Sequence, residues 1–121
     1  MSAAFDREAA LDRFGGDIRL MKDLIVVFLE NAPRQLAEIR ESIASCDSRR
    51  LERVAHTLKG DAGMWETYGV QETAKRLETM ARDGDFSETE TTCTQLEVEL
   101  GGLTNALREF LSDAHPVHDQ K

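Results

Sequence analysis

The sequence predicts an all-α protein, an antiparallel four-helix bundle with a short additional N-terminal helix. Three observations support this fold class. Apolar residues recur in steps of three and four along four long segments, which is the period of an amphipathic helix. Strand signals are scarce, because no stretch alternates apolar and polar residues for long and no Asn-Gly or Asp-Gly turn joins two β-rich runs. Short turns separate the segments, so consecutive helices are expected to pack antiparallel.

The first two helices are defined by their end signals. A short helix is expected from about Asp6 to Phe14, where the pair Gly15–Gly16 stops it. Asp17 is then expected to cap a long second helix. Pro33 lies inside this helix, and the apolar pattern resumes beyond it, so one kinked helix is expected. The stripe expected to be buried comprises Ile18, Met21, Ile25, Phe28, Ala32, Leu36, Ile39 and Ile43.

Three more helices follow the break at residues 45–48. The third is expected to start near Ser48 and to bury Leu51, Val54, Ala55, Leu58, Ala62 and Trp65. A turn at 66–69 precedes the fourth, whose buried side carries Val70, Ala74, Leu77 and Ala81. After a turn at 82–85, Ser87 and Glu90 form a capping box for the last helix. Its seam has coiled-coil spacing and comprises Cys93, Leu96, Leu100, Leu103, Leu107 and Phe110, with Gly101–Gly102 as a possible bend.

Length and composition indicate one domain. The 121 residues suffice for a single core, which we expect to span residues 1–113, with a flexible C-terminal tail at 114–121. The longest apolar run, at 24–29, is far too short to cross a bilayer, and no secretory signal is visible, so a cytoplasmic protein that does not bind membranes is expected. Cys46 and Cys93 are expected to be reduced thiols. A net charge of −8 argues against a nucleic-acid partner, and we expect a monomer.

The third helix carries a basic island in this acidic chain. Residues 49–60 contain four cations, Arg49, Arg50, Arg53 and Lys59, and a single anion, Glu52. A local excess of positive charge indicates a task that involves negative charge. The competing interpretation is a solvated helix face, which charge alone does not exclude.

His56 is the candidate around which these cations lie. On a helical wheel it points about 150° away from the buried stripe, in the same sector as Arg53, Gly60 and Gly63. An exposed imidazole is nucleophilic and largely uncharged at neutral pH. Each of the two glycines inside the helix lowers helix stability by about 1 kcal/mol relative to alanine. We interpret them as positions where the absence of a side chain lets a bulky partner reach the ring. The adjacent cations would offset the charge of a phosphoryl group on the ring.

The segment "AHTLKG", residues 55–60, resembles the His-x-x-Lys-Gly signature of histidine-containing phosphotransfer (HPt) domains. The similarity extends over roughly residues 10–78. It implies that His56 is the phosphoacceptor, that Lys59 steadies the phosphoryl group and that Gly60 gives access. It also implies reversible exchange with an aspartate on a response-regulator receiver domain, with a hybrid histidine kinase as a further partner. The receiver would supply Mg²⁺, so no cofactor of its own is expected. Asp61 and Glu66 depart from the family pattern, which commonly has a small residue and a glycine there.

Five further residues are candidates for binding, and two rival functions remain. Gly63 and Met64 are candidate docking contacts, and antiparallel packing places Glu78 opposite His56, with Arg82 one turn away; a solvated flank is the competing interpretation of the last two. Arg53 completes the binding set. The first rival is a helical-bundle adaptor that binds a receiver or kinase without taking phosphate.

The second rival function is an enzyme. A histidine kinase needs an ATP-binding domain, and neither a glycine-rich phosphate loop nor room for one is present, so no ATP-binding or autokinase activity is expected. His115 and His118 in "HPVH" lack a third ligand, and no metal site is expected.

Overall fold

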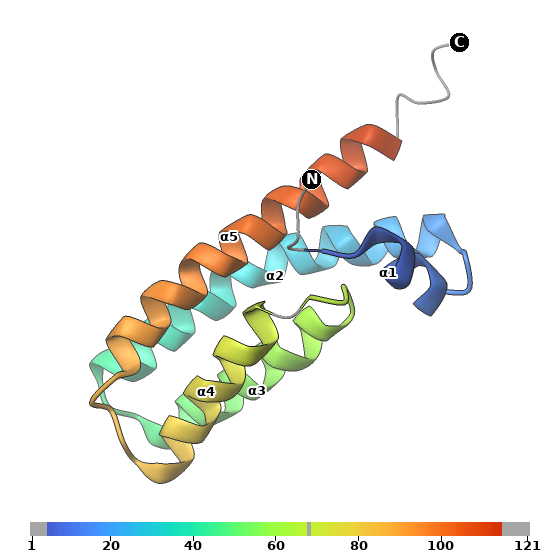
Figure 1. Ribbon diagram of the computed structural model, residues 1–121. Coiled ribbons are helices and arrows are strands. Elements are labelled where there is room, and N and C mark those ends of the chain that lie inside the picture. The colour runs from blue at the N-terminus through green and yellow to red at the C-terminus, as the bar shows by residue number, and fades with distance from the viewer. Residues whose placement is uncertain (1–4, 68, 115–121) are drawn as a thin grey trace.

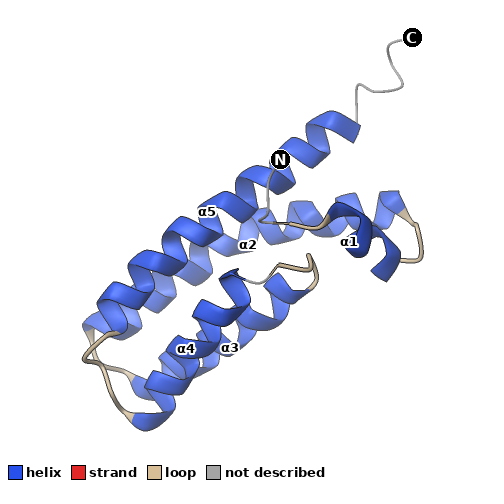
Figure 2. Ribbon diagram, viewed as in Figure 1, coloured by secondary structure: helices blue, strands red, loops and turns tan. Residues whose placement is uncertain are grey.

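The computed structural model describes residues 5–67 and 69–114. Over these residues it contains five helices and no strand (Figure 2). The helices are α1 (Arg7–Arg13), α2 (Ile18–Ala44), α3 (Ser48–Gly63), α4 (Gly69–Asp83) and α5 (Thr89–Ala114). The main contacts join α2 to α3, α3 to α4, α4 to α5 and α5 back to α2, which closes a ring of four helices. The long helices α2 and α5 run side by side, the shorter pair α3 and α4 packs against them, and α1 lies at the N-terminal half of α2 (Figure 1). The predicted fold class is confirmed.

Aspartate caps begin the first three helices. Asp6, Asp17 and Asp47 each have an extended backbone, and each side chain accepts a hydrogen bond from the backbone N–H three residues later. Between α1 and α2, Gly15 and Gly16 have φ angles of +65° and +80°, a left-handed conformation that a residue with a Cβ rarely adopts. The predicted starts of the first three helices and the stop after the first are therefore confirmed, and α2 passes through Pro33 as a single helix, as expected.

The predicted capping box of the last helix is wrong. α5 begins at Thr89, and Ser87 lies outside it. The backbone N–H and the hydroxyl of Ser87 both donate to Asp85 Oδ1, over 3.0 and 2.7 Å, which holds Ser87 in the turn. These two hydrogen bonds also lower the pKa of the Asp85 carboxyl. Asp85 thus accepts from the Ser87 backbone N–H that the Glu90 carboxylate would have bound in a capping box.

The predicted core is confirmed at all but two positions. The expected buried residues of α3, α4 and α5 are buried, including Trp65 directly after α3. In α2 the stripe is buried from Met21 onward, whereas Ile18 is 44 % exposed and Leu36 is half-buried. Ile18 is the first residue of α2, and its turn precedes the part of the helix that faces the bundle.

An aromatic cluster joins α1 to the bundle. The Trp65 ring centroid lies 6.4 Å from that of Phe5, 5.8 Å from that of Phe14 and 6.1 Å from that of Phe28. Phe5 also packs edge-on against Phe110 of α5 at 6.0 Å. Offset and edge-to-face pairs of this kind are favourable. The cluster therefore anchors the short N-terminal helix where α3 ends.

Within residues 5–67 and 69–114, no helix combines the length and apolar character that a membrane span needs. Ala114 is the last residue of α5. The rest of the predicted tail, with His115 and His118, lies outside the described residues.

Candidate functional site

His56 stands on the outer surface of α3. Its neighbours Ala55 and Leu58 are fully buried, and this stripe fixes the rotation of the helix. The imidazole consequently points outward, and its side chain is 66 % exposed. The expectation that the ring lies outside the core is confirmed.

Glu78 of α4 holds this ring from one side. Its carboxylate is buried, with 8 % of the side chain exposed, and Oε2 lies 2.8 Å from Nδ1 of His56. Its other oxygen, Oε1, accepts a hydrogen bond from Lys59 Nζ over 2.8 Å. The hydrogen bond from Lys59, with a further one from His56, outweighs the opposing effect of burial and lowers the pKa of the Glu78 carboxyl. The interpretation of Glu78 as a solvated flank is therefore wrong.

This contact determines which ring nitrogen is available. An ionised carboxylate can only accept a hydrogen bond, so Nδ1 of His56 must carry the proton. The lone pair of the neutral ring then resides on Nε2. Because the side chain is mostly exposed, the arrangement presents a nucleophilic nitrogen to an incoming molecule and keeps the other nitrogen bound to the protein.

Arg82 of α4 links the site to the preceding turn of α3. Its Nη2 donates to Glu78 Oε2 over 3.3 Å, and its Nε donates to Glu52 Oε2 over 3.1 Å. Lys59 and Arg82 thus contact the same buried carboxylate from two directions. Glu52 was not among the residues predicted from the sequence for this group. Its position one helical turn before His56 was the available signal, because an anion there can pair with a cation such as Arg82 on the facing helix.

The two glycines of the sector have different surroundings. A Cβ built on Gly60 would meet nothing within 4 Å, so the surface beside His56 is open, as predicted. A Cβ on Gly63 would lie 2.9 Å from Nε2 of Gln71 on α4. Gly63 therefore admits a neighbouring side chain of the same protein, and its interpretation as bare surface is wrong.

The other two binding candidates differ in exposure. Arg53 is exposed on the same outer face of α3 as His56. Met64, which follows α3, is half-buried and packs partly against the core. The structure thus brings His56, Lys59, Glu78 and Arg82 into one bonded group, and leaves Arg53 and Met64 at its periphery.

The two departures from the family pattern are accommodated outside this group. Asp61 accepts a hydrogen bond from Gln35 Nε2 of α2 over 2.9 Å, on the side of α3 opposite Lys59. Glu66 has a φ of +52°, the left-handed conformation that glycine adopts most readily. Its carboxylate accepts from Arg13 Nε of α1 over 2.7 Å, so the turn that glycine would favour is tied to α1 by an ion pair.

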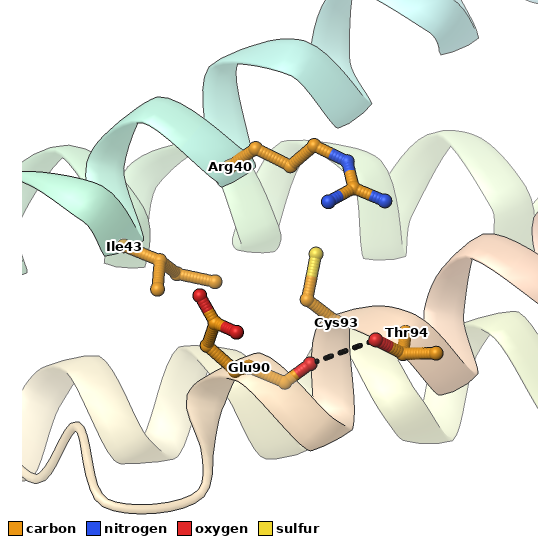
Figure 3. Close-up of a pocket in the computed structure, with 5 residues that line it drawn as sticks. All are labelled: Arg40, Ile43, Glu90, Cys93 and Thr94. Carbon is orange, nitrogen blue, oxygen red and sulfur yellow. Dashed lines mark hydrogen bonds between the residues drawn. The ribbon is translucent and has the colours of Figure 1, made fainter.

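A hollow of about 70 Å³ lies between α2 and α5, and no residue of the His56 group lines it. Figure 3 shows Cys93 in its wall, below Arg40 and beside the Thr94 hydroxyl that donates to the Glu90 carbonyl oxygen. Burial raises the pKa of the Cys93 thiol, which disfavours the reactive thiolate. No group of three potential metal ligands occurs in the described part of the chain. The His56 group is therefore the stronger candidate site.

Comparisons with known proteins identify the family and the fold. A family model described as the Hpt domain matches residues 23–114, a range that contains every residue of the His56 group. The fold is similar to that of histidine-containing phosphotransfer protein B (HptB) from Pseudomonas aeruginosa PAO1, with a TM-score of 0.83 and 17 % identity over 90 % of this chain and 95 % of that one. It is also similar to the HPT domain of the Hpt sensor hybrid histidine kinase from Shewanella, with a TM-score of 0.81 and 17 % identity over 92 % and 96 % of the two chains. No curated protein sequence matches the chain.

Proposed function

We propose that His56 is the residue that carries the phosphoryl group in this chain, which belongs to the Hpt domain family and so has a histidine phosphotransfer role in phosphorelays. The observation that supports this assignment is the pairing of His56 Nδ1 with the buried Glu78 carboxylate at 2.8 Å, on a side chain that is 66 % exposed. No other histidine lies within the described residues. The proposed partners are receiver domains of response regulators and a hybrid histidine kinase.

The proposed reaction is a transfer between nitrogen and oxygen. The Nε2 lone pair of His56 attacks the phosphorus of an aspartyl phosphate on the receiver domain. The N–P bond forms as the P–O bond breaks, and the electron pair of that bond leaves on the aspartate carboxylate. Nδ1 keeps its proton, so the ring becomes positively charged, and the Glu78 carboxylate stabilises that charge. The reverse transfer uses the same contacts.

Neighbouring residues would assist this transfer. Phosphoryl transfer passes through a loose transition state in which positioning and charge neutralisation dominate. Lys59 is on the same helix, one turn from His56, and its ammonium would bind the phosphoryl oxygens. Gly60 leaves open the surface that the receiver must approach. Arg53 and Met64 would contact the docked receiver at the edge of the site.

We further propose that the chain carries phosphate without making or hydrolysing ATP. Catalytic Mg²⁺ would be supplied by the receiver domain, because the described residues offer no cluster of metal ligands. A carrier must share a compartment with the kinase that uses ATP, so we place it in the cytoplasm. One exposed His56 per chain is sufficient for the exchange, and we propose that the chain acts as a monomer.

Transfer of radiolabelled phosphate tests the assignment. A receiver domain charged with labelled phosphate is mixed with the native protein, with His56→Gln, and with the double variant His115→Gln/His118→Gln as the matched control. We expect label on the native protein and on the control but not on His56→Gln, while all three have the same helical circular dichroism. Label on His56→Gln would contradict the site. A native protein that binds the receiver without taking label would instead indicate the adaptor.

A further inference from the structure

We propose that Arg82 is a positioning residue that holds Glu78 against His56 while Lys59 is occupied by the phosphoryl group. This inference rests on the proposed function and adds a step to it. It follows from the number and direction of the contacts that the Glu78 carboxylate makes.

The Glu78 carboxylate is shared among three donors. Oε1 accepts from Lys59, whereas Oε2 accepts from both His56 and Arg82. A carboxylate with only 8 % of its side chain exposed depends on such partners, because water contributes little to its solvation. Lys59 makes the shorter contact of the two cations, at 2.8 Å against 3.3 Å for Arg82. In the unphosphorylated protein Lys59 is therefore the main counter-ion.

Phosphorylation changes this balance. A phosphoryl group on His56 carries a charge of about −1.5 to −2, more than that of the carboxylate. Lys59 lies one turn along α3 from His56, with 29 % of its side chain exposed, so its ammonium can turn towards the new anion. Glu78 would then keep the charged His56 ring as a partner on Oε2, but it would face a second anion with its counter-ion on Oε1 withdrawn. If the ring were its only remaining partner, the carboxylate would be free to rotate towards water, and Nδ1 would lose its acceptor.

Arg82 is placed to prevent this loss. Its guanidinium contacts Glu78 through Nη2 on the same oxygen that binds His56, and its Nε is fixed by Glu52. A guanidinium has separate N–H groups for two carboxylates at once, so it can hold both without moving. Arg82 lies one turn beyond Glu78 on α4, with Glu52 on α3, so both helices fix its position. We infer that this second cation preserves the Nδ1 hydrogen bond in the phosphorylated state.

The test compares Arg82→Ala with Arg76→Ala. Arg76 is an exposed arginine of the same helix that donates to Gln95 of α5, away from the site. Nitrogen and proton NMR on histidine-labelled protein report the Nδ1–H of His56 before and after phosphorylation, and rapid quench reports transfer to a receiver domain. A merely structural role would not distinguish between the two phosphorylation states in the NMR measurement.

For Arg82→Ala we expect the Nδ1–H signal of the unphosphorylated protein to persist, because Lys59 still holds Glu78. In the phosphorylated protein we expect its exchange with water to accelerate about tenfold and the onward transfer to slow by a similar factor. Arg76→Ala should match the native protein in both states. Protection and transfer rate within twofold of native in phosphorylated Arg82→Ala would overturn the inference. Label at His56 of the native protein supports the proposed function separately, and its absence would overturn both.

Discussion

The contact between Glu78 and His56 makes a quantitative prediction for Glu78→Gln. Glutamine keeps an oxygen that can accept from Nδ1 but removes the negative charge. In the proposed transfer the ring becomes cationic 2.8 Å from that carboxylate. Two unit charges about 4 Å apart interact by about 4 kcal/mol at an effective dielectric of 20. Because 66 % of the His56 side chain is exposed, solvent screens this interaction, and we take about half of it, about 2 kcal/mol.

A barrier higher by about 2 kcal/mol corresponds to a transfer about 30-fold slower. Rapid-quench measurement of transfer from a phosphorylated receiver gives this rate. The matched control is Glu72→Gln, because Glu72 is exposed and lies in the first turn of the same helix. We expect Glu72→Gln to transfer at the native rate. A Glu78→Gln rate within threefold of native would refute the reasoning, because it would show that the carboxylate does not stabilise charge on the ring.

Three further predictions concern stability. Gly60→Ala should raise the free energy of unfolding by about 1 kcal/mol, since the added Cβ meets nothing within 4 Å, and urea unfolding measures this effect. The same methyl group lies on the surface that a receiver would approach, so it should slow phosphoryl transfer in the labelling assay. Glu66→Gly and Glu66→Ala both remove the ion pair with Arg13, yet the glycine variant should be more stable by about 1 kcal/mol because φ is +52° there; equal stability would argue against backbone strain. The lowered pKa of Glu78 contributes stability that is present above the ordinary carboxyl pKa of about 4.3 and is lost as pH falls through the folded value, so the advantage of the native protein over Glu78→Gln in thermal unfolding should shrink below about pH 4.

The helices were predictable because their signals are local. The apolar period located the buried stripes, and aspartates such as Asp17 marked where helices begin. Periodicity describes each helix separately and contains no information on which side chains meet across a pair. Antiparallel packing correctly placed Glu78 opposite His56. The burial of Glu78 and the covering of Gly63 by Gln71 depend on how the side chains of α3 and α4 fit together, which the helical period does not describe.

Local competition explains the other differences. Ser87 has the sequence of a capping residue, but Asp85 two positions earlier offers a closer acceptor and takes both of its donors. At position 66 the family commonly has a glycine, and the structure shows that Glu66 adopts a left-handed φ of +52° there and forms an ion pair with Arg13. Such long-range compensation has no short-range signature.

Every residue of the His56 group belongs to α3, which ends at Gly63, or to α4, which begins at Gly69. A slide of one of these helices along the other by a single residue, about 1.5 Å, would separate donors from acceptors. Movement of the α3–α4 hairpin as a unit against α2 and α5 would leave all of these bonds intact. The geometry of the His56 group therefore depends on the register between α3 and α4, and not on where this hairpin lies against the two long helices.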